Sequence, residues 1–257
     1  MEAKKNQQSS MKTIDKALRL LGFFTIETPE YRLSDIARAA DVDKATALRI
    51  LNSLSSGGLV EHDPDTKKYR LGTAVLRLAR IRETCSPIVS VLQPLVDRLA
   101  ESTGESAHAG LPSDNGIATI AICEPNRATR VRIEQTQILP FNATASGLVF
   151  LAFSSTGFAD RWLSKSKIQS FTDETLVDAA DVKKRLADIK SKGFAYSAGS
   201  FEPDVVGFAA PVFDWHLNVV ATIAVACVRS RLTSQNRKQI ENLVVAAAAE
   251  ATATLGG

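Results

Sequence analysis

The sequence predicts an α+β protein with two domains: a small N-terminal domain, and a larger domain whose mostly antiparallel sheet is flanked by helices. The chain has 257 residues, which is long for one ordinary domain and comfortable for two. Residues 32–72 combine two helix-like stretches with a hairpin-like stretch. In the rest of the chain, helix-like and strand-like stretches mix without strict alternation, which is typical of an α+β domain.

The composition indicates a cytoplasmic protein. Apolar residues make up 45% of the chain and charged residues 23%, as in soluble globular proteins. The start, MEAKKNQQSS, contains no apolar secretory segment, and the longest apolar run, Val219–Val228, is too short to span a bilayer. Three cysteines, Cys85, Cys123 and Cys227, lie far apart without metal-ligand spacing. We therefore expect free thiols, and no metal, cofactor or membrane partner.

Basic residues are more frequent in the N-terminal part. Residues 1–85 carry 15 Lys and Arg against 11 Asp and Glu, a net charge of +4, whereas the remainder carries a net charge of −1. A mildly basic N-terminal part on a near-neutral body favours phosphate contact in that part. The difference is small, so it supports the motif described below and does not establish a function.

The first domain is expected to cover residues 12–72. Residues 1–11 are polar and are expected to form a disordered arm, although its lysines leave a contact with DNA open. Thr13 is expected to cap a core helix. The apolar positions that repeat at helical spacing in this helix are Ile14, Ala17, Leu18, Leu21 and Phe24.

Two further helices follow, separated by a short break. The first runs from Leu33 to Ala40, and the break at Asp41–Lys44 carries Asp43, a good N-cap for the second helix. Gly57 and Gly58 are expected to end the second helix in the manner of a left-handed C-cap. The face expected to be buried in this second helix comprises Ala47, Leu48, Leu51 and Leu54.

The opposite face of the second helix has the side chains needed to read a base-pair edge. Ala45, Thr46, Arg49, Asn52 and Ser53 supply small groups, hydroxyls, an amide and one guanidinium. A hairpin follows, with strands at Leu59–Val60 and Tyr69–Leu71 and the turn Asp63–Thr66 between them. Helix, turn, helix and basic hairpin together predict a winged helix-turn-helix that binds double-stranded DNA.

Each candidate DNA-binding residue has an expected role. Thr46 and Arg49 are expected to contact bases, with Ala45 and Asn52 beside them. The residues expected to contact phosphates are Lys44, Lys67, Lys68 and Arg70. The alternative is that these helices and the hairpin contact a protein, because such elements also occur in small domains that never bind nucleic acid.

This stretch resembles the N-terminal domain of the IclR family of bacterial transcriptional regulators. The similarity is carried by Ile36-Ala37, Lys44 with Thr46, Arg49, Gly58 and Tyr69-Arg70-Leu71-Gly72. The family usually has proline where this chain has Asp43, and serine where it has Ala45. The first difference keeps a helix start, and the second removes a hydroxyl from the face that reads DNA. The resemblance implies DNA binding, and the two differences make the operator sequence less predictable.

Residues 73–85 are expected to form a linker helix, with Val75, Leu76, Ala79 and Arg82 along one stripe. Ser86-Pro87 then marks the start of a second domain at residues 86–257. Its first helix is expected to bury Ile88, Leu92, Leu95 and Leu99 and to end at Gly104. Strands are expected at Ser106–Leu111, Ile117–Ile122, Thr129–Glu134, Phe194–Ala198, Val205–Phe213 and Val219–Val228. The other helices are expected at Ala145–Phe153, Phe158–Ser164 and Ala179–Lys192, and from Thr233 onward.

The second domain resembles the GAF-like effector-binding domain of the same family. The matching stretches are Leu139-Pro140, Asn142–Gly147, Gly193–Ala195, Phe201-Glu202, Ala209–Asp214 and Ser230–Thr233. The resemblance implies a homodimer or homotetramer and an effector pocket. The expected walls of the pocket are the helix start at Ala145-Ser146-Gly147, the segment from Ser197 to Gly207, and the strand with Ala224 and Ala226.

Physical chemistry favours an anionic effector in this pocket. The free N–H groups and dipole of a helix start attract an anion, although Ser146 and Gly147 could instead only cap and pack. His108 lies mid-strand and either faces the cavity or sits in the core. Gly207, Ala224 and Ala226 stand where small-keto-acid sensors of the family have a cysteine and two serines. The pocket is therefore expected to be roomy and apolar and to take a hydrophobic or aromatic carboxylic acid.

An enzymatic function has little support in the sequence. It contains no G-x-S-x-G elbow, no P-loop and no cluster of His, Cys and Asp at ligand spacing. Zinc, which some family members bind, lacks evident ligands here. No catalytic residue is expected, and an enzyme with an accessory DNA-binding domain remains the weaker alternative, together with the protein-interaction module.

Overall fold

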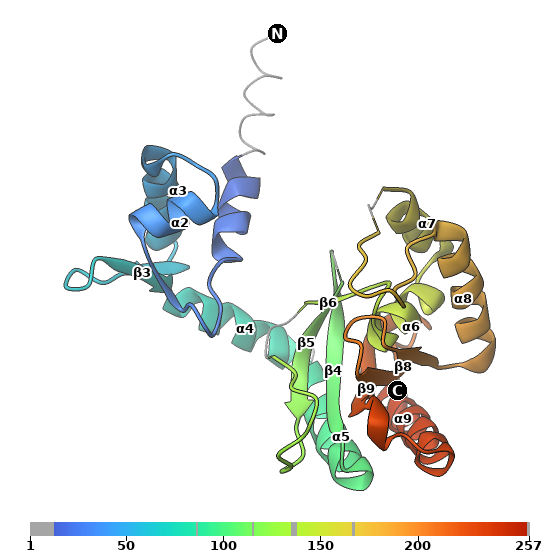
Figure 1. Cartoon of the computed structure of the whole chain (residues 1–257). Helices are drawn as coiled ribbons and strands as arrows, with labels where there is room; N and C mark the ends of the chain where they lie inside the picture. Colours follow the sequence, from blue (N-terminus) through green and yellow to red (C-terminus); the bar gives the residue numbers. More distant parts are fainter. Residues whose placement is uncertain (1–12, 86, 115, 135–137, 166–167, 256–257) are drawn as a thin grey trace. The chain divides into compact units, whose positions relative to one another are not determined.

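The computed structural model describes residues 13–85, 87–114, 116–134, 138–165 and 168–255 (Figure 1). The chain divides into two compact units, Met1–Pro87 and Ile88–Gly257. The fold is α+β, as predicted, with a helix-turn-helix in the first unit and an antiparallel sheet in the second. The arm expected at residues 1–11 and the cap expected at Ser86 lie outside the described residues.

The first unit has the predicted winged helix-turn-helix and one additional strand. Its elements are a helix over residues 13–21, β1 (Glu30–Arg32), α2 (Leu33–Ala39), α3 (Lys44–Ser56), β2 (Val60–His62), β3 (Lys68–Leu71) and α4 (Thr73–Cys85). The antiparallel sheet has the order β1-β3-β2, so the wing hairpin β2–β3 is paired with β1 through β3. Strand β1 was not predicted, because its three residues are too few to show a strand pattern.

The apolar stripes of two helices are rotated from their expected positions. In the helix over residues 13–21, Leu20 is fully buried whereas Ile14 and Leu18 are exposed. In α3, Ile50 is 4% exposed and Leu48 is 38% exposed. The observed stripes, Ala17-Leu20-Leu21-Phe24 and Ala47-Ile50-Leu51-Leu54, keep the helical i, i+3, i+4, i+7 spacing and pack into one core. The predictions for Ile14, Leu18 and Leu48 were therefore wrong.

Helix α4 has no buried residue in the chain as described. Its stripe was expected at Val75, Leu76 and Ala79, but Leu76 is 73% exposed, and Leu78 and Ile81 are also exposed. A backbone hydrogen bond attaches the start of α4 to the residues before the wing: Ala74 N donates to Gly58 O at a distance of 3.0 Å. The helix is thus continuous with the wing while most of its apolar surface faces outward.

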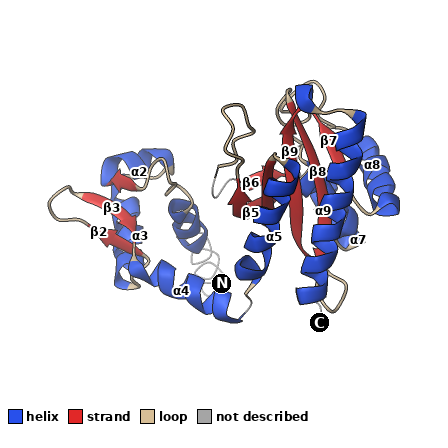
Figure 2. Cartoon of the chain, turned by 90° about the horizontal axis from the view of Figure 1, so that it is seen from below, coloured by secondary structure: helices blue, strands red, loops and turns tan. Residues whose placement is uncertain are grey.

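The second unit is built on a six-stranded antiparallel sheet with the order β6-β5-β4-β9-β8-β7 (Figure 2). The strands are β4 (Ser106–Ser113), β5 (Gly116–Cys123), β6 (Ile138–Pro140), β7 (Ala195–Ala198), β8 (Val205–Phe213) and β9 (Val219–Val228). The helices are α5 (Ile88–Thr103), α6 (Ala145–Phe153), α7 (Thr156–Lys165), α8 (Ala179–Lys192) and α9 (Ser234–Leu255), with a short 3₁₀ turn at Arg229–Arg231.

The two faces of this sheet have different covers (Figure 2). Helices α5 and α9 pack on one face, where Leu92, Phe208 and Val244 are among the fully buried side chains. Helices α6 and α8 cover part of the other face, where alternate residues of the same strands point. Near the ends of β8 and β9 this second face is covered by Val131 and Ile133. The division matters because Ala224 and Ala226 lie on the second face.

One predicted strand of this unit is absent, and one observed strand was not predicted. Thr129–Glu134 was expected to be a strand but has no regular structure, and β6 was not expected. Val131 and Ile133 do alternate with polar neighbours, as in a strand, but they pack on Ala226 without ladder hydrogen bonds.

None of the helices in the described part of the chain combines the length and the hydropathy that a membrane span requires.

Candidate functional site

Helix α3 is positioned by the capping interaction that the sequence predicts. Asp43 Oδ1 accepts a hydrogen bond from Thr46 N at 2.8 Å, and this bond lowers the pKa of the Asp43 carboxyl below its ordinary value. At the other end Gly58 has φ +70°, the left-handed conformation expected after a helix. The cap and the glycine fix both ends of the helix whose outer face was expected to read DNA.

That outer face is open in the first unit. Ala45, Arg49 and Asn52 are exposed and Thr46 is half-buried. Arg49 Nη2 donates a hydrogen bond to Thr46 Oγ1 at 3.2 Å, so the two residues expected to contact bases lie together. The arrangement presents a guanidinium, a hydroxyl and an amide on one helical surface, which are groups that can bond to base edges in the major groove.

The wing has basic residues in two different environments. Lys68 Nζ lies 3.4 Å from Glu30 Oε2, and Arg70 Nε lies 3.4 Å from Glu61 Oε2. Lys67, at φ +57°, follows a turn in which Asp63 Oδ1 accepts from two backbone amides. Lys44 and Lys67 form no ion pair with any described residue. Their charges are therefore more available to phosphates than those of Lys68 and Arg70.

The second unit has a cavity of about 70 Å³ where α6 begins, at the second face of the sheet. Seven of the eight residues expected in the effector pocket line it: His108, Ala145, Ser146, Ser197, Gly207, Ala224 and Ala226. The eighth, Gly147, does not line the cavity. A Cβ at Gly147 would lie 2.4 Å from both Phe141 Cα and Pro140 O, so this glycine allows α6 to pack closely.

The start of α6 leaves two amides for a ligand. Thr144 Oγ1 accepts from Gly147 N at 3.0 Å, and Thr144 O accepts from Leu148 N at 2.9 Å. The amides of Ala145 and Ser146 precede these and have no intrahelical acceptor. Gly207 lies opposite, where a Cβ would be 3.2 Å from Ala145 Cβ and 3.8 Å from Ala145 N. The absence of a side chain at Gly207 thus leaves space beside the helix start.

His108 lies next to this helix start and is 6% exposed. Its Nε2 lies 3.1 Å from Ser146 Oγ, while its Nδ1 has no hydrogen-bond partner among the described residues. Burial lowers the pKa of the imidazole to about 4, so the ring is neutral at pH 7. His108 therefore faces the cavity, which was one of the two positions left open by the sequence.

A loop that the sequence analysis did not assign to the site forms another wall. Val131, Arg132 and Ile133 line the cavity. The loop is attached by Ser106 Oγ, which donates to Val131 O at 2.5 Å, and by Arg231 Nη1, which donates to Thr129 O at 2.9 Å. The apolar alternation in this stretch was a usable signal of burial, although it was interpreted as a strand.

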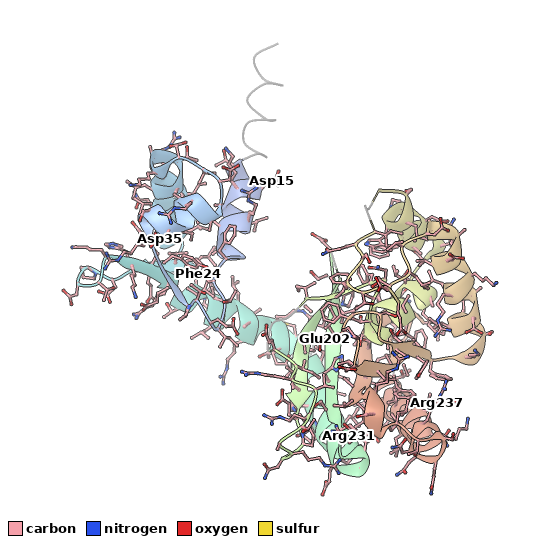
Figure 3. All side chains as sticks on the ribbon, viewed as in Figure 1. Asp15, Phe24, Asp35, Glu202, Arg231 and Arg237 are labelled. Carbon is pink, nitrogen blue, oxygen red and sulfur yellow. The ribbon has the colours of Figure 1, made fainter. Side chains whose placement is uncertain are left out.

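The cavity walls are mostly apolar, with charges on two residues. Among the described residues that line it, Arg132 and Glu202 are the charged ones, and Glu202 is labelled in Figure 3. Both also line a neighbouring surface pocket of about 320 Å³. Ser197 Oγ donates its proton to Ala143 O at 3.3 Å, whereas the direction of the bond between Ser146 Oγ and His108 depends on the imidazole tautomer.

No group of three or more His, Cys, Asp or Glu side chains in the described residues could hold a metal ion. His62 is exposed on the wing, with its ring tilted 45° to that of Tyr69 and the ring centroids 4.6 Å apart, and His216 is exposed in the β8–β9 turn.

Relatives of known class match nearly the whole chain. The chain is 26% identical over 240 residues to the HTH-type transcriptional regulator BhcR of Paracoccus denitrificans, covering 93% of this chain and 86% of that protein. It is 22% identical over 249 residues to the transcriptional repressor IclR of Escherichia coli, covering 96% and 91% of the two chains.

Solved structures of IclR-family proteins also match nearly the whole chain. The structure of an IclR transcriptional regulator from Silicibacter sp. TM1040 matches with a TM-score of 0.86 and 35% identity, covering 95% of this chain and 96% of that chain. An IclR homolog from Microbacterium hydrocarbonoxydans, complexed with 4-hydroxybenzoate, has the same fold with a TM-score of 0.77, 21% identity and coverage of 95% and 98%.

The family models account for both units of the chain. Residues 13–64 match the IclR helix-turn-helix domain, which contains α2 and α3. Residues 84–253 match the bacterial transcriptional regulator IclR C-terminal domain, which contains the cavity. The chain therefore belongs to the IclR family of bacterial transcriptional regulators.

Proposed function

We propose that this chain binds an operator through α3 and the wing, and that a small carboxylic acid bound at the start of α6 controls that binding. The observation that carries the proposal is that one chain has both an open polar face on α3 and a cavity walled by His108 and Ser146. A regulator needs both a DNA-binding surface and a ligand site, and no catalytic group is needed for either. Since operator DNA lies in the bacterial cytoplasm, we expect the protein to be located there.

Operator recognition is proposed to divide between two sets of side chains. Thr46 and Arg49 contact bases, with Ala45 and Asn52 beside them; three of these residues are exposed on α3 and Thr46 is half-buried. The phosphate contacts come from Lys44, Lys67, Lys68 and Arg70, with Lys68 and Arg70 exchanging their present carboxylate partners for phosphates. Paired recognition helices require two half-sites, so the DNA-bound form is a homodimer or homotetramer.

The effector is proposed to be a hydrophobic or aromatic carboxylic acid. Its carboxylate binds the amides of Ala145 and Ser146 and the Ser146 hydroxyl, and its apolar body contacts Ala224, Ala226 and the loop residues Val131 and Ile133. The IclR homolog of the same fold that is complexed with 4-hydroxybenzoate supports this class, because that ligand is an aromatic carboxylic acid.

Control requires that the effector bind two quaternary arrangements of the protein with different affinities. Such an effector shifts the equilibrium between these arrangements and changes the spacing of the recognition helices. An effector with equal affinity for both would not affect DNA binding, however tightly it bound.

The experiment is a binding titration of the purified chain with DNA from upstream of its own gene. It is performed at two salt concentrations, with and without acetate, benzoate, 4-hydroxybenzoate, glyoxylate and pyruvate. We expect specific binding that weakens with salt and changes with an aromatic acid. Tight binding of glyoxylate or pyruvate without binding of the aromatic acids would contradict the effector class. Absence of specific DNA binding under all conditions would instead favour the protein-interaction function.

A further inference from the structure

The buried side chains of His108 and Ser146 are hydrogen-bonded to each other in the wall of the cavity. Both side chains line the cavity, and both are more than nine-tenths buried. The distance from His108 Nε2 to Ser146 Oγ is 3.1 Å, and no described residue bonds to His108 Nδ1. Burying an imidazole with one unpartnered nitrogen costs stability, and such costs are typical of functional sites.

A neutral imidazole can form this bond in two ways. If the proton is on Nε2, the ring donates to Ser146 Oγ, and the serine proton is free to turn into the cavity. If the proton is on Nδ1, Ser146 donates to Nε2 and offers only lone pairs to a ligand. A carboxylate only accepts hydrogen bonds, so it binds to the first form, whereas a neutral group that donates is compatible with the second.

The surroundings favour a carboxylate at the serine. The amides of Ala145 and Ser146 are the first in α6, where the helix dipole stabilises negative charge, and the amide of Gly147 is occupied by Thr144 Oγ1. Gly207 leaves the approach to Ala145 N open. Two amides and one hydroxyl thus lie at one end of a mostly apolar cavity, whose charged wall residues are Arg132 and Glu202.

Building on the proposed effector site, we propose that His108 is a positioning residue. It donates from Nε2 to Ser146 Oγ and holds the Ser146 hydroxyl as a donor to the effector carboxylate. His108 does not touch the carboxylate in this arrangement and acts through Ser146. The consequence is selectivity: the pair makes the cavity prefer an acid over the neutral amide of the same shape.

The test compares acids with their amides by calorimetric titration of the full chain. The probes are acetate, benzoate and 4-hydroxybenzoate, each against acetamide, benzamide and 4-hydroxybenzamide. We expect at least one acid to bind wild-type protein about tenfold or more tightly than its amide, since hydrogen bonds to charged groups are the stronger ones. Failure of every acid to bind more tightly than its amide would overturn the proposal.

Substitutions of His108 distinguish a side chain that positions Ser146 from one that only fills space. In His108→Leu the affinity for the acid should fall about tenfold while that for the amide stays nearly constant, so that the acid-to-amide ratio approaches one. His108→Gln, whose side-chain amide retains an N–H donor, should restore much of the ratio. Equal losses for acid and amide in His108→Leu would show that the ring only fills space.

A double-variant cycle tests the route through Ser146. Ser146→Ala should lower the acid affinity about tenfold, and adding His108→Leu to it should have little further effect. Ser164→Ala, an exposed hydroxyl on α7, is the matched control and should bind like wild type. Additive losses in the double variant would contradict the proposal. DNA binding of the same proteins, measured separately, distinguishes failure of this inference from failure of the proposed function.

Discussion

Arg49 is the residue on which base recognition depends in this account. Its guanidinium is exposed on α3 and hydrogen-bonded to Thr46, which orients it before DNA arrives. We expect Arg49→Ala to lower operator affinity by about 1–3 kcal/mol and to relax preference at one base position, because a bidentate contact to guanine is lost. Competition titrations with single-base operator variants measure both effects.

The matched control for this substitution is Arg161→Ala, which removes an exposed guanidinium from α7 in the other unit. Operator affinity should be unchanged in Arg161→Ala. If Arg49→Ala kept both the affinity and the base preference of wild type, Arg49 would have no role in reading DNA.

The burial of His108 predicts that the free energy of unfolding depends on pH. The folded chain lowers the pKa of this ring from 6.5 to about 4, so below pH 6.5 the unfolded chain takes up a proton that the folded chain does not. The free energy of unfolding therefore falls as the pH falls from 6.5 towards 4. Between pH 7 and pH 5 the loss from this group is about 2 kcal/mol.

Urea unfolding of wild type and His108→Gln at pH 7 and pH 5 measures this contribution. The variant has no imidazole at this position, so its stability should fall by about 2 kcal/mol less than that of wild type over the same interval. Other groups titrate in both proteins and cancel in the difference. An identical fall in both proteins would show that His108 is not buried as a neutral ring.

Most residues expected in the effector pocket lie together in the structure. Seven of the eight line one cavity: helix-start physics indicated the α6 start, and the family resemblance indicated the positions on β7, β8 and β9. Gly147 was placed in the pocket with packing as its alternative role, and the short distance from its Cβ position to Phe141 favours that alternative. Leu48 and Leu18 were assigned to buried stripes although neighbouring apolar residues, Ile50 and Leu20, fit the same period.

Among the elements, the wing provides a test based on salt dependence. Lys67 follows the hairpin turn and has no ion pair with a described residue, so it is available for one phosphate contact. We expect Lys67→Ala to reduce the slope of log K against log salt by about 1, with equal loss on specific and nonspecific DNA. The control Lys238→Ala, an exposed lysine of α9, should keep the wild-type slope.

Helix α6 provides a test of close packing. A Cβ at Gly147 would meet the backbone of Phe141 and Pro140 at 2.4 Å, and backbone cannot move aside as a flexible side chain can. We expect Gly147→Ala to destabilise the protein by about 1–3 kcal/mol, measured by urea unfolding. Gly157→Ala, whose Cβ would meet only the end of the Arg161 side chain, should be at least as stable as wild type, because alanine favours a helix more than glycine does. Equal stability of all three proteins would contradict the packing of α6.

Elements with strong periodicity were predictable, and short or irregular ones were not. The bounds of α6, α8, β8 and β9 agree with the sequence analysis, because apolar runs and clear end signals such as Gly193 delimit them. Strands β1 and β6 have three residues each and no pattern of their own. Thr129–Glu134 has strand-like alternation but packs as a loop, since burial sets alternation and pairing requires a neighbouring strand.

For the whole molecule, membership of the IclR family and the combination of winged unit and cavity unit were within reach of the sequence. The identity of the effector was not, because it depends on wall positions that come from separate segments: β4, the loop at Val131–Ile133, the α6 start and β9. Such a site is defined by the tertiary fold, and a linear pattern identifies only one wall at a time.

Operator binding and acid binding are proposed to be linked in one protein. The most direct measurement is the Kd of the acid that affects DNA binding, determined for the free protein and for the protein saturated with operator. Linkage requires the two Kd values to differ by the same factor by which the acid changes operator affinity, expected to be about 5–150-fold. An acid Kd that is identical with and without operator would contradict the account.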